Sequence, residues 1–305
     1  MTTTDWDGRG LPPVAQARIA RAAGQHVRTS LLGASAAVTL DAVGFEPVGE
    51  VMGCVVEHIG WSGYGCGVYT GAGAGYGAQY GYAPTMTSGT GGYMGYAPYV
   101  DALYYGYEMS LHRMLLEAQA LGADGVVGVR WTQDRLDENQ NREFVALGTA
   151  VRARSASRPA HLFATDLAGT DVAKAMHGGW MPTGLVAGIA VAIRHDDYYT
   201  RMQARSWSGY NIEVEGYTEL VTHVRADARA QFANRAARQG GDAAVVSDMT
   251  LQVWEIEPSD NHRDHVAESI VIGSSVARFH DGVDAPTDSL TILPLRGTER
   301  RRQQS

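Results

Sequence analysis

The segment "GFEPVGEVMGCVVEH" (Gly44–His58) decides how this chain is read, because a later segment repeats its pattern. Gly179–Ile193 reads "GWMPTGLVAGIAVAI" and aligns with it without a gap, 135 residues further along. Both segments have a glycine followed by an aromatic residue, then a proline, and then two glycines that flank a valine. Self-similarity at a fixed spacing is the sequence signature of repeated units. We therefore expect the same unit to occur twice in the 305 residues.

Two further blocks recur in the same order. "EAQALGADGVVGV" (Glu117–Val129) resembles "RAARQGGDAAVVS" (Arg235–Ser247), 118 residues later. "LGTAV" (Leu147–Val151) resembles "IGSSV" (Ile272–Val276), 125 residues later. Three blocks in one order predict a tandem duplication. The expected organisation is an N-terminal helical extension (1–28), a first unit (29–154), a polar linker (155–161), a second unit (162–280) and a C-terminal tail (281–305).

The first unit is longer because it contains an uncharged stretch rich in glycine and tyrosine, residues 60–98. Such a composition buries too little apolar area to offset the entropy of ordering the chain. Glycine gives a flexible backbone and tyrosine gives amphipathic rings, which suit adhesive contacts. The insert could plug or gate a central opening or dock a protein partner or cargo, and a purely decorative loop is equally open. The candidate contact residues are Tyr64, Tyr69, Tyr76, Tyr80, Tyr82, Tyr93 and Tyr96.

Apolar periodicity predicts a strand, a long helix and two strands in each unit, preceded by a short helix. In the first unit these are expected at 34–44 (helix), 48–58, 100–121 (helix), 125–131 and 143–153. In the second they are expected at 170–177 (helix), 183–194, 217–239 (helix), 243–253 and 266–278. The fold class is therefore α+β, an antiparallel sheet on one long helix. One helix covers one face of such a sheet, so the other face and the edges need a partner.

Three sequence blocks carry a resemblance to a known family. "FEPVGEVMG", "ALGADGVVGVR" and "ALGTAV" of the first unit resemble the YbjQ family, also called UPF0145 or heavy-metal-binding domain (DUF74-like) proteins. The second unit departs from the family pattern at "QGGDAAVVSD". The resemblance implies a dodecin-like β-α-β-β unit that forms fivefold rings, with short strands added between subunits. It also implies a homo-oligomer of five or ten chains or a larger cage, and it supplies no catalytic residues.

Two polar loops of the second unit contain candidate metal ligands. "RHDDYY" contains His195 and Asp197, and "SDNHRDH" contains His262, Asp264 and His265. If the loops meet, their nitrogen and oxygen atoms would suit zinc or a similar divalent ion. The alternative is a pair of polar hairpin tips, since these residue types are common in loops. The first unit has no counterpart to these loops.

Asp124 and Asp242 occupy matching positions at the turn between the long helix and the next strand. They could form a ring of carboxylates around a pore of the oligomer. Alternatively each is a turn residue whose side chain bonds nearby backbone amides.

Composition excludes several classes of function. The net charge of −8 argues against a surface that neutralises nucleic-acid phosphates. The longest apolar run is far shorter than the ~20 residues of a membrane span. Two cysteines and the absence of a signal pattern favour a cytoplasmic protein. No P-loop, nucleophile elbow or H-E-x-x-H motif appears. We expect a non-catalytic, homo-oligomeric ring or shell protein, with a metal-binding or metal-responsive protein as the alternative.

Overall fold

The computed structural model describes most of both predicted units. The described residues are 6, 10–24, 30–59, 85–88, 96–136, 141–155, 161–205, 211–259 and 262–279. The N-terminal extension is helical where it is described, as α1 (Pro13–Gly24). Residues 280–305, which include the predicted tail, lie outside this part of the chain.

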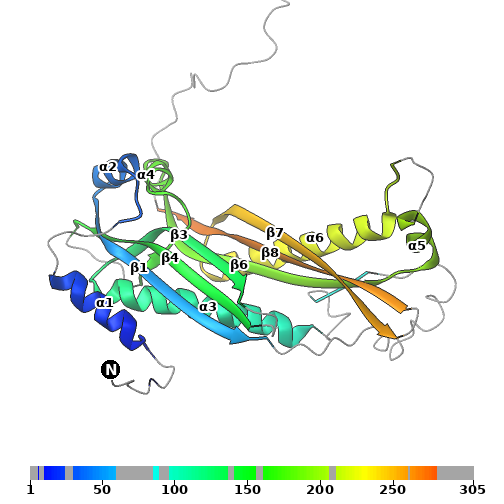
Figure 1. Cartoon of the computed structure of the whole chain (residues 1–305). Coiled ribbons are helices and arrows are strands. Elements are labelled where there is room, and N and C mark those ends of the chain that lie inside the picture. Colours follow the sequence, from blue (N-terminus) through cyan, green and yellow to red (C-terminus); the bar gives the residue numbers. More distant parts are fainter. Residues whose placement is uncertain are drawn as a thin grey trace, which may run out of the picture.

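Two four-stranded sheets form the framework (Figure 1). Sheet A has the order β1-β4-β3-β5 and sheet B has the order β2-β6-β8-β7. All neighbouring strands are antiparallel except β3 and β5, which are parallel. The strands of sheet A are β1 (Phe45–His58), β3 (Gly125–Arg135), β4 (Asn141–Ala153) and β5 (Phe163–Ala164). Those of sheet B are β2 (Met86–Thr87), β6 (Trp180–His195), β7 (Ala243–Ser259) and β8 (His262–Arg278).

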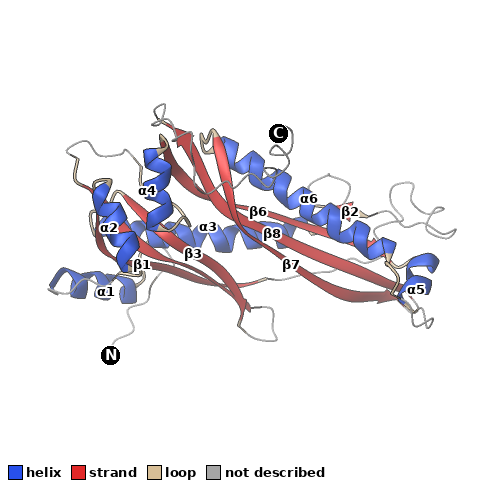
Figure 2. Ribbon diagram, turned by 90° about the horizontal axis from the view of Figure 1, so that it is seen from above, coloured by secondary structure: helices blue, strands red, loops and turns tan. Residues whose placement is uncertain are grey.

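The helices follow the predicted order, and each predicted helix and strand is present. They are α2 (Ala34–Ala42), α3 (Ala97–Ala120), α4 (Gly169–His177), α5 (Tyr198–Ala204) and α6 (Glu215–Arg238). Periodicity did not predict α5 or the short strands β2 and β5. Gly44 and Gly179 follow the ends of α2 and α4 with φ of +86° and +83°, a conformation that favours glycine. The two short helices lie side by side (Figures 1 and 2).

Sheets A and B repeat the same local details. The register of β1 against β4 shifts between Pro47 and Gly49, and that of β6 against β8 shifts between Pro182 and Gly184. β1 and β6 also each contain a glycine that contacts the long helix packed on the same sheet. A Cβ on Gly53 would collide with the Ser110 carbonyl of α3, and one on Gly188 would collide with the Ala228 carbonyl of α6. Glycine is needed there because the helix backbone rests directly on the strand.

Helix α3 packs against sheet A and also against sheet B, although it was expected to cover the sheet of the first unit alone. One core cluster joins α3 and sheet A to residues of sheet B, among them Ile189, Ile193 and Ile270. A second cluster joins α6 to the opposite face of sheet B (Figure 2). The second unit was expected to need another copy of the chain to cover its sheet. That expectation was wrong for sheet B, because the first half of the same chain covers it.

The Gly/Tyr insert is partly built into the fold. Met86 and Thr87 form β2 along the edge of β6, and α3 begins at Ala97, inside the stretch expected to be a loop. Tyr96 is completely buried and packs edge-to-face on Tyr99, so it is a core residue and not a contact for a partner. The other six candidate tyrosines lie outside the described residues. Among the described helices, none has the length and apolar character needed to cross a bilayer.

Candidate functional site

The two halves of the chain meet by exchanging edge strands. The segment Leu162–Ala168, here called the second leader, precedes α4 and crosses to sheet A. There the Thr165 amide donates to the Val126 carbonyl at 2.9 Å, and the Val129 amide donates to the Thr165 carbonyl at 3.0 Å. A segment of the second half therefore completes the edge of the sheet in the first half.

The insert of the first half makes the reciprocal contact on β6. The Ser88 amide donates to the Val191 carbonyl at 2.8 Å, and the Val191 amide donates to Ser88 Oγ at 3.0 Å. The Ile189 amide donates to the Tyr104 hydroxyl at 2.8 Å. These bonds satisfy edge groups of β6 that would otherwise be open to another strand.

A buried polar network fixes the register between the halves. Tyr99 of α3 donates its hydroxyl proton to Glu268 of β8 and accepts a bond from Arg142 of β4. Arg142 Nη1 lies 3.6 Å from Glu268 Oε1, and the Glu268 side chain is 1% exposed. Burial, followed by the charge of Glu268, raises the pKa of Tyr99 far above its usual value. Tyr99 therefore remains a protonated donor throughout the physiological range.

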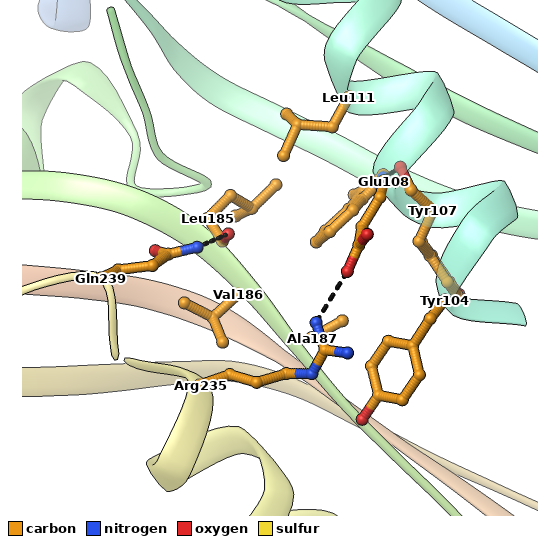
Figure 3. Close-up of a pocket in the computed structure, with 10 residues that line it drawn as sticks. Tyr104, Tyr107, Glu108, Leu111, Leu185, Val186, Ala187, Arg235 and Gln239 are labelled. Atoms are coloured by element: carbon orange, nitrogen blue, oxygen red, sulfur yellow. Dashed lines mark hydrogen bonds and ion pairs between the residues drawn. The ribbon is translucent and has the colours of Figure 1, made fainter. Parts of the chain in front are cut away.

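A cavity of about 140 Å³ lies between α3 and sheet B (Figure 3). Arg235 of α6 spans it, with Nη1 2.7 Å from Glu108 Oε1 and its guanidinium carbon 3.6 Å from the centre of the Tyr104 ring. Leu111 and Leu185 supply apolar walls. Ligand pockets are usually about 300–1,000 Å³. We interpret this cavity as a packing gap in the contact between the halves and not as a substrate pocket.

The two predicted His/Asp loops do meet at one end of sheet B. His195 Nδ1 lies 2.7 Å from Asp264 Oδ1, and His265 Nδ1 lies 2.9 Å from Asp196 Oδ1. His195 and Asp264 are direct partners across the strands, and His265 is paired with the preceding residue, Arg194. Side chains alternate between the faces of a sheet. The two histidines therefore point to opposite faces and form two separate pairs.

Other contacts at this end are structural. Asp197 caps α5 by accepting the Thr200 amide at 2.8 Å, and it also pairs with Arg194 at 3.2 Å. The Tyr217 hydroxyl donates to Asp196 at 3.2 Å. Burial, followed by Asp196, raises the pKa of Tyr217 to about 12. Neither Arg194 nor Tyr217 was predicted as a site residue. Tyr217 lies on α6, which reaches the cluster from a distant part of the chain.

The predicted metal ligands do not form one ligand set in the described part of the chain. No group of three or more His, Cys, Asp or Glu side chains there is arranged to hold a metal ion. His262 pairs with Ser259 across the β7–β8 hairpin, and its side chain lies outside the description. A metal site on these loops therefore stays a prediction.

Asp124 and Asp242 make the same bond at their two turns. Asp124 Oδ2 accepts the Ala153 amide at 2.7 Å, and Asp242 Oδ2 accepts the Arg278 amide at 2.9 Å. Each carboxylate thus ties its turn to the end of a strand, β4 in sheet A and β8 in sheet B, which is the turn role. A carboxylate ring at a pore stays a prediction.

Cys54 lies on the face of sheet A that points away from α3. Its Sγ is 3.2 Å from Glu143 Oε1. Burial, followed by the bond to Glu143, raises the pKa of the Cys54 thiol to about 11. The thiol is therefore a poor nucleophile near neutral pH, because the thiolate is the reactive form.

Comparisons with known proteins agree with the predicted family. Residues 81–154 match the YbjQ family model, whose description reads "Putative heavy-metal-binding". A UPF0145 protein of Halorubrum lacusprofundi is 41% identical over 56 residues, which span 18% of this chain and 53% of that protein. The resemblance to the YbjQ family, predicted from the sequence blocks, is confirmed for this part of the chain.

A second relative extends over almost the whole chain. The encapsulin nanocompartment protein Rv1762c of Mycobacterium tuberculosis is 28% identical over 293 residues. The alignment covers 93% of this chain and 97% of the relative, so both halves have counterparts in one protein. No solved structure matches the chain.

Proposed function

We propose that this chain is a non-catalytic structural subunit that associates with copies of itself in a protein compartment. The observation that carries the proposal is that the two halves of the chain cover one face of sheet B and one edge of each other's sheets. The outer face of sheet A and the edge of β7 have no such cover among the described residues. The full-length likeness to an encapsulin nanocompartment protein points to the same class of assembly.

We also propose that the chain is a tandem duplication of a YbjQ-like unit. The paired bulges at Pro47 and Pro182 and the paired helix contacts of Gly53 and Gly188 support it. Helices α3 and α6 both have 24 residues and lie 118 residues apart, the spacing of the second repeated block. A repeated unit can reuse one contact many times, which is how closed symmetric assemblies form.

Two surfaces of the described chain stay open to another copy. β7 is a terminal strand of sheet B, and Val253 on it is 47% exposed. Val56, on the outer face of sheet A, is 49% exposed. The edge of β1 is partly closed, because the Met52 carbonyl accepts from Arg18 and the Cys54 carbonyl accepts from Arg113. A long open edge such as that of β7 favours pairing with another chain. We propose a ring of five or ten chains or a larger cage, with the Gly/Tyr insert at its opening or at the contact with a cargo protein.

Electron microscopy of the purified full chain tests this proposal. Closed rings or shells of uniform size are expected. Dispersed particles of single-chain size at micromolar concentration would contradict it. Location of the chain on the inside of a compartment built from another protein would keep the compartment role but overturn self-assembly as a shell.

Binding of a divalent metal is the second candidate function. The family model described as "Putative heavy-metal-binding" matches residues 81–154, whereas the candidate ligands lie in the second half of the chain. The histidine pairs offer His195 on one face of sheet B and His265 on the other. Calorimetric titration with zinc or nickel should then give a signal that the double variant His262→Ala/His265→Ala reduces. His58→Ala, on sheet A, is the matched control. Equal signals from all three proteins would rule out this site.

A further inference from the structure

The two halves hold their leaders in the same way. In the second half, the Asp166 amide donates to Ser274 Oγ at 3.2 Å. In the first half, the Leu31 amide donates to Thr149 Oγ1 at 3.1 Å. Leu31 and Asp166 are 135 residues apart, and Thr149 and Ser274 are 125 apart, which are the spacings of the repeated blocks. The first leader, Ser30–Gly33, therefore bonds to Thr149 of sheet A in the way that the second leader bonds to Ser274 of sheet B.

The second leader also forms backbone hydrogen bonds with the edge of β3, where Thr165 bonds to Val126 and Val129. The equivalent edge of β7 has no such strand among the described residues. At the 118-residue spacing, Ala244 and Ser247 of β7 match Val126 and Val129. β7 is the last strand of sheet B, and β8 is its single partner among the described strands. β7 thus offers, on an exposed edge, the site that β3 offers within the chain.

One exposed residue on the outer face of sheet A and one on α6 have opposite charges. Leu111 of α3 and Leu185 of β6 line the cavity between the two halves (Figure 3). Leu111 matches Arg229 of α6 at the 118-residue spacing, and Leu185 matches Glu50 of β1 at the 135-residue spacing. Both Arg229 and Glu50 are exposed. An apolar pair inside the chain therefore corresponds to a pair of opposite charges on its outer surfaces.

We propose that the first leader and the Glu50 face of sheet A dock on the β7 edge and the Arg229 face of α6 of a second copy of this chain. Ser30 occupies the place of Thr165, between Ala244 and Ser247 of the second copy, and Glu50 faces Arg229. The contact is head-to-tail, because the two chains use different surfaces, so it closes a ring or continues a shell. This inference rests on the self-association proposed above and specifies its interface.

Charge reversal tests the interface by sedimentation velocity on the full chain. Glu50→Arg places two arginines opposite each other, and Arg229→Glu places two glutamates there. Each single variant should dissociate with an apparent Kd raised by roughly tenfold or more, because like charges in contact are repulsive. An equimolar mixture of the two variants should reassemble, because every contact between unlike variants joins Arg to Glu, and a closed ring with an odd number of chains needs one like-charge contact at most. Arg205→Glu, beside α5, makes the same charge change away from the interface and should assemble as the wild type does.

The outcomes separate the inference from the proposed function. Assembly of the wild type and of both single variants alike would overturn this interface and leave self-association standing. A wild type that sediments as single chains would overturn the proposed function itself. When both variants fold, as judged by circular dichroism, reassembly in the mixture supports the interface, and no gain over the separate variants overturns it. If one variant fails to fold, the other variant compared with Arg205→Glu tests the contact, and equal assembly of these two overturns it.

Discussion

Tyr99 of α3 donates a hydrogen bond to Glu268 of β8, which joins the first half of the chain to the second through a buried contact. Arg142 of β4 completes the network, so helix α3 and one strand from each sheet share one set of polar atoms. A buried charge is tolerated when it is paired and bonded in this way. The relative placement of the two halves therefore depends on this cluster as well as on apolar packing.

Removal of Glu268 should be strongly destabilising. Glu268→Ala leaves the Arg142 guanidinium buried without its carboxylate, and we expect the free energy of unfolding to fall by about 3–5 kcal/mol. Denaturant unfolding of the full chain measures the change. Asp171→Ala removes one partner of an exposed ion pair with Lys174 and should cost less than about 1 kcal/mol. Equal effects of the two variants would contradict a structural role for the network.

The glycine contacts of β1 and β6 predict a matched pair of variants. Gly53→Ala and Gly188→Ala each push a methyl group into the backbone of the covering helix, and we expect losses of about 1–3 kcal/mol. Gly178 has a φ of −77°, which alanine adopts, and its added Cβ would meet no atom closer than 3.3 Å, so Gly178→Ala is the control. Thermal melting measures all three. A neutral Gly53→Ala alone would show that the two halves differ at this contact.

The Cys54 thiol should react slowly and with a steep dependence on pH. With a pKa of about 11, roughly one thiol in a thousand is ionised at pH 8, and the fraction grows tenfold for each pH unit up to the pKa. Alkylation by iodoacetamide in a Cys66→Ser background should follow that rise. Glu143→Gln should lower the pKa and speed the reaction near pH 8, because it removes a neighbouring negative charge. A rate that levels off near pH 9 would contradict the pKa shift.

Cys54 also reports on assembly, because it lies on the same face of sheet A as Glu50. In the Cys66→Ser background, Cys54 should be protected in the assembled protein. The Glu50→Arg variant should lose this protection as it dissociates. Identical rates in assembled and dissociated samples would place the contact elsewhere.

Two nested deletions distinguish β2 and Ser88 from residues 63–84 of the insert. Deletion of 63–84 leaves β2 and Ser88 in place, so the melting temperature should stay near that of the wild type. Deletion of 63–88 removes the bonds of Ser88 to Val191 and opens the edge of β6, and the melting temperature should fall by several degrees. Unchanged assembly and cargo content in the shorter deletion would favour a decorative insert.

Sequence patterns predicted the order of the helices and strands, because apolar periodicity and the repeated blocks are local features. They also identified His195 and Asp264 as candidates in two segments whose meeting the sequence left open, and the pairing of β6 with β8 brings the two residues together. The coverage of sheet B by α3 was missed. One signal was present: α3 has a second apolar stripe, with Tyr104 and Leu111 outside the stripe of Leu103 and Met114.

The short strands could not be predicted from local pattern. Met86 and Thr87 form a strand because the open edge of β6 lies beside them, and Phe163 and Ala164 do so beside β3. Neither dipeptide has a strand pattern of its own. His195 and His265 point to opposite faces of sheet B because of the register between β6 and β8, which the loop residues alone do not specify.

Native mass spectrometry of the full chain at micromolar concentration tests the central claim most directly. One chain has a mass of 32.7 kDa, and we expect a single closed assembly at a defined multiple of that mass. A spectrum dominated by 32.7 kDa across the concentration range would contradict it, because the open edge of β7 and the outer face of sheet A would then stay uncovered in solution.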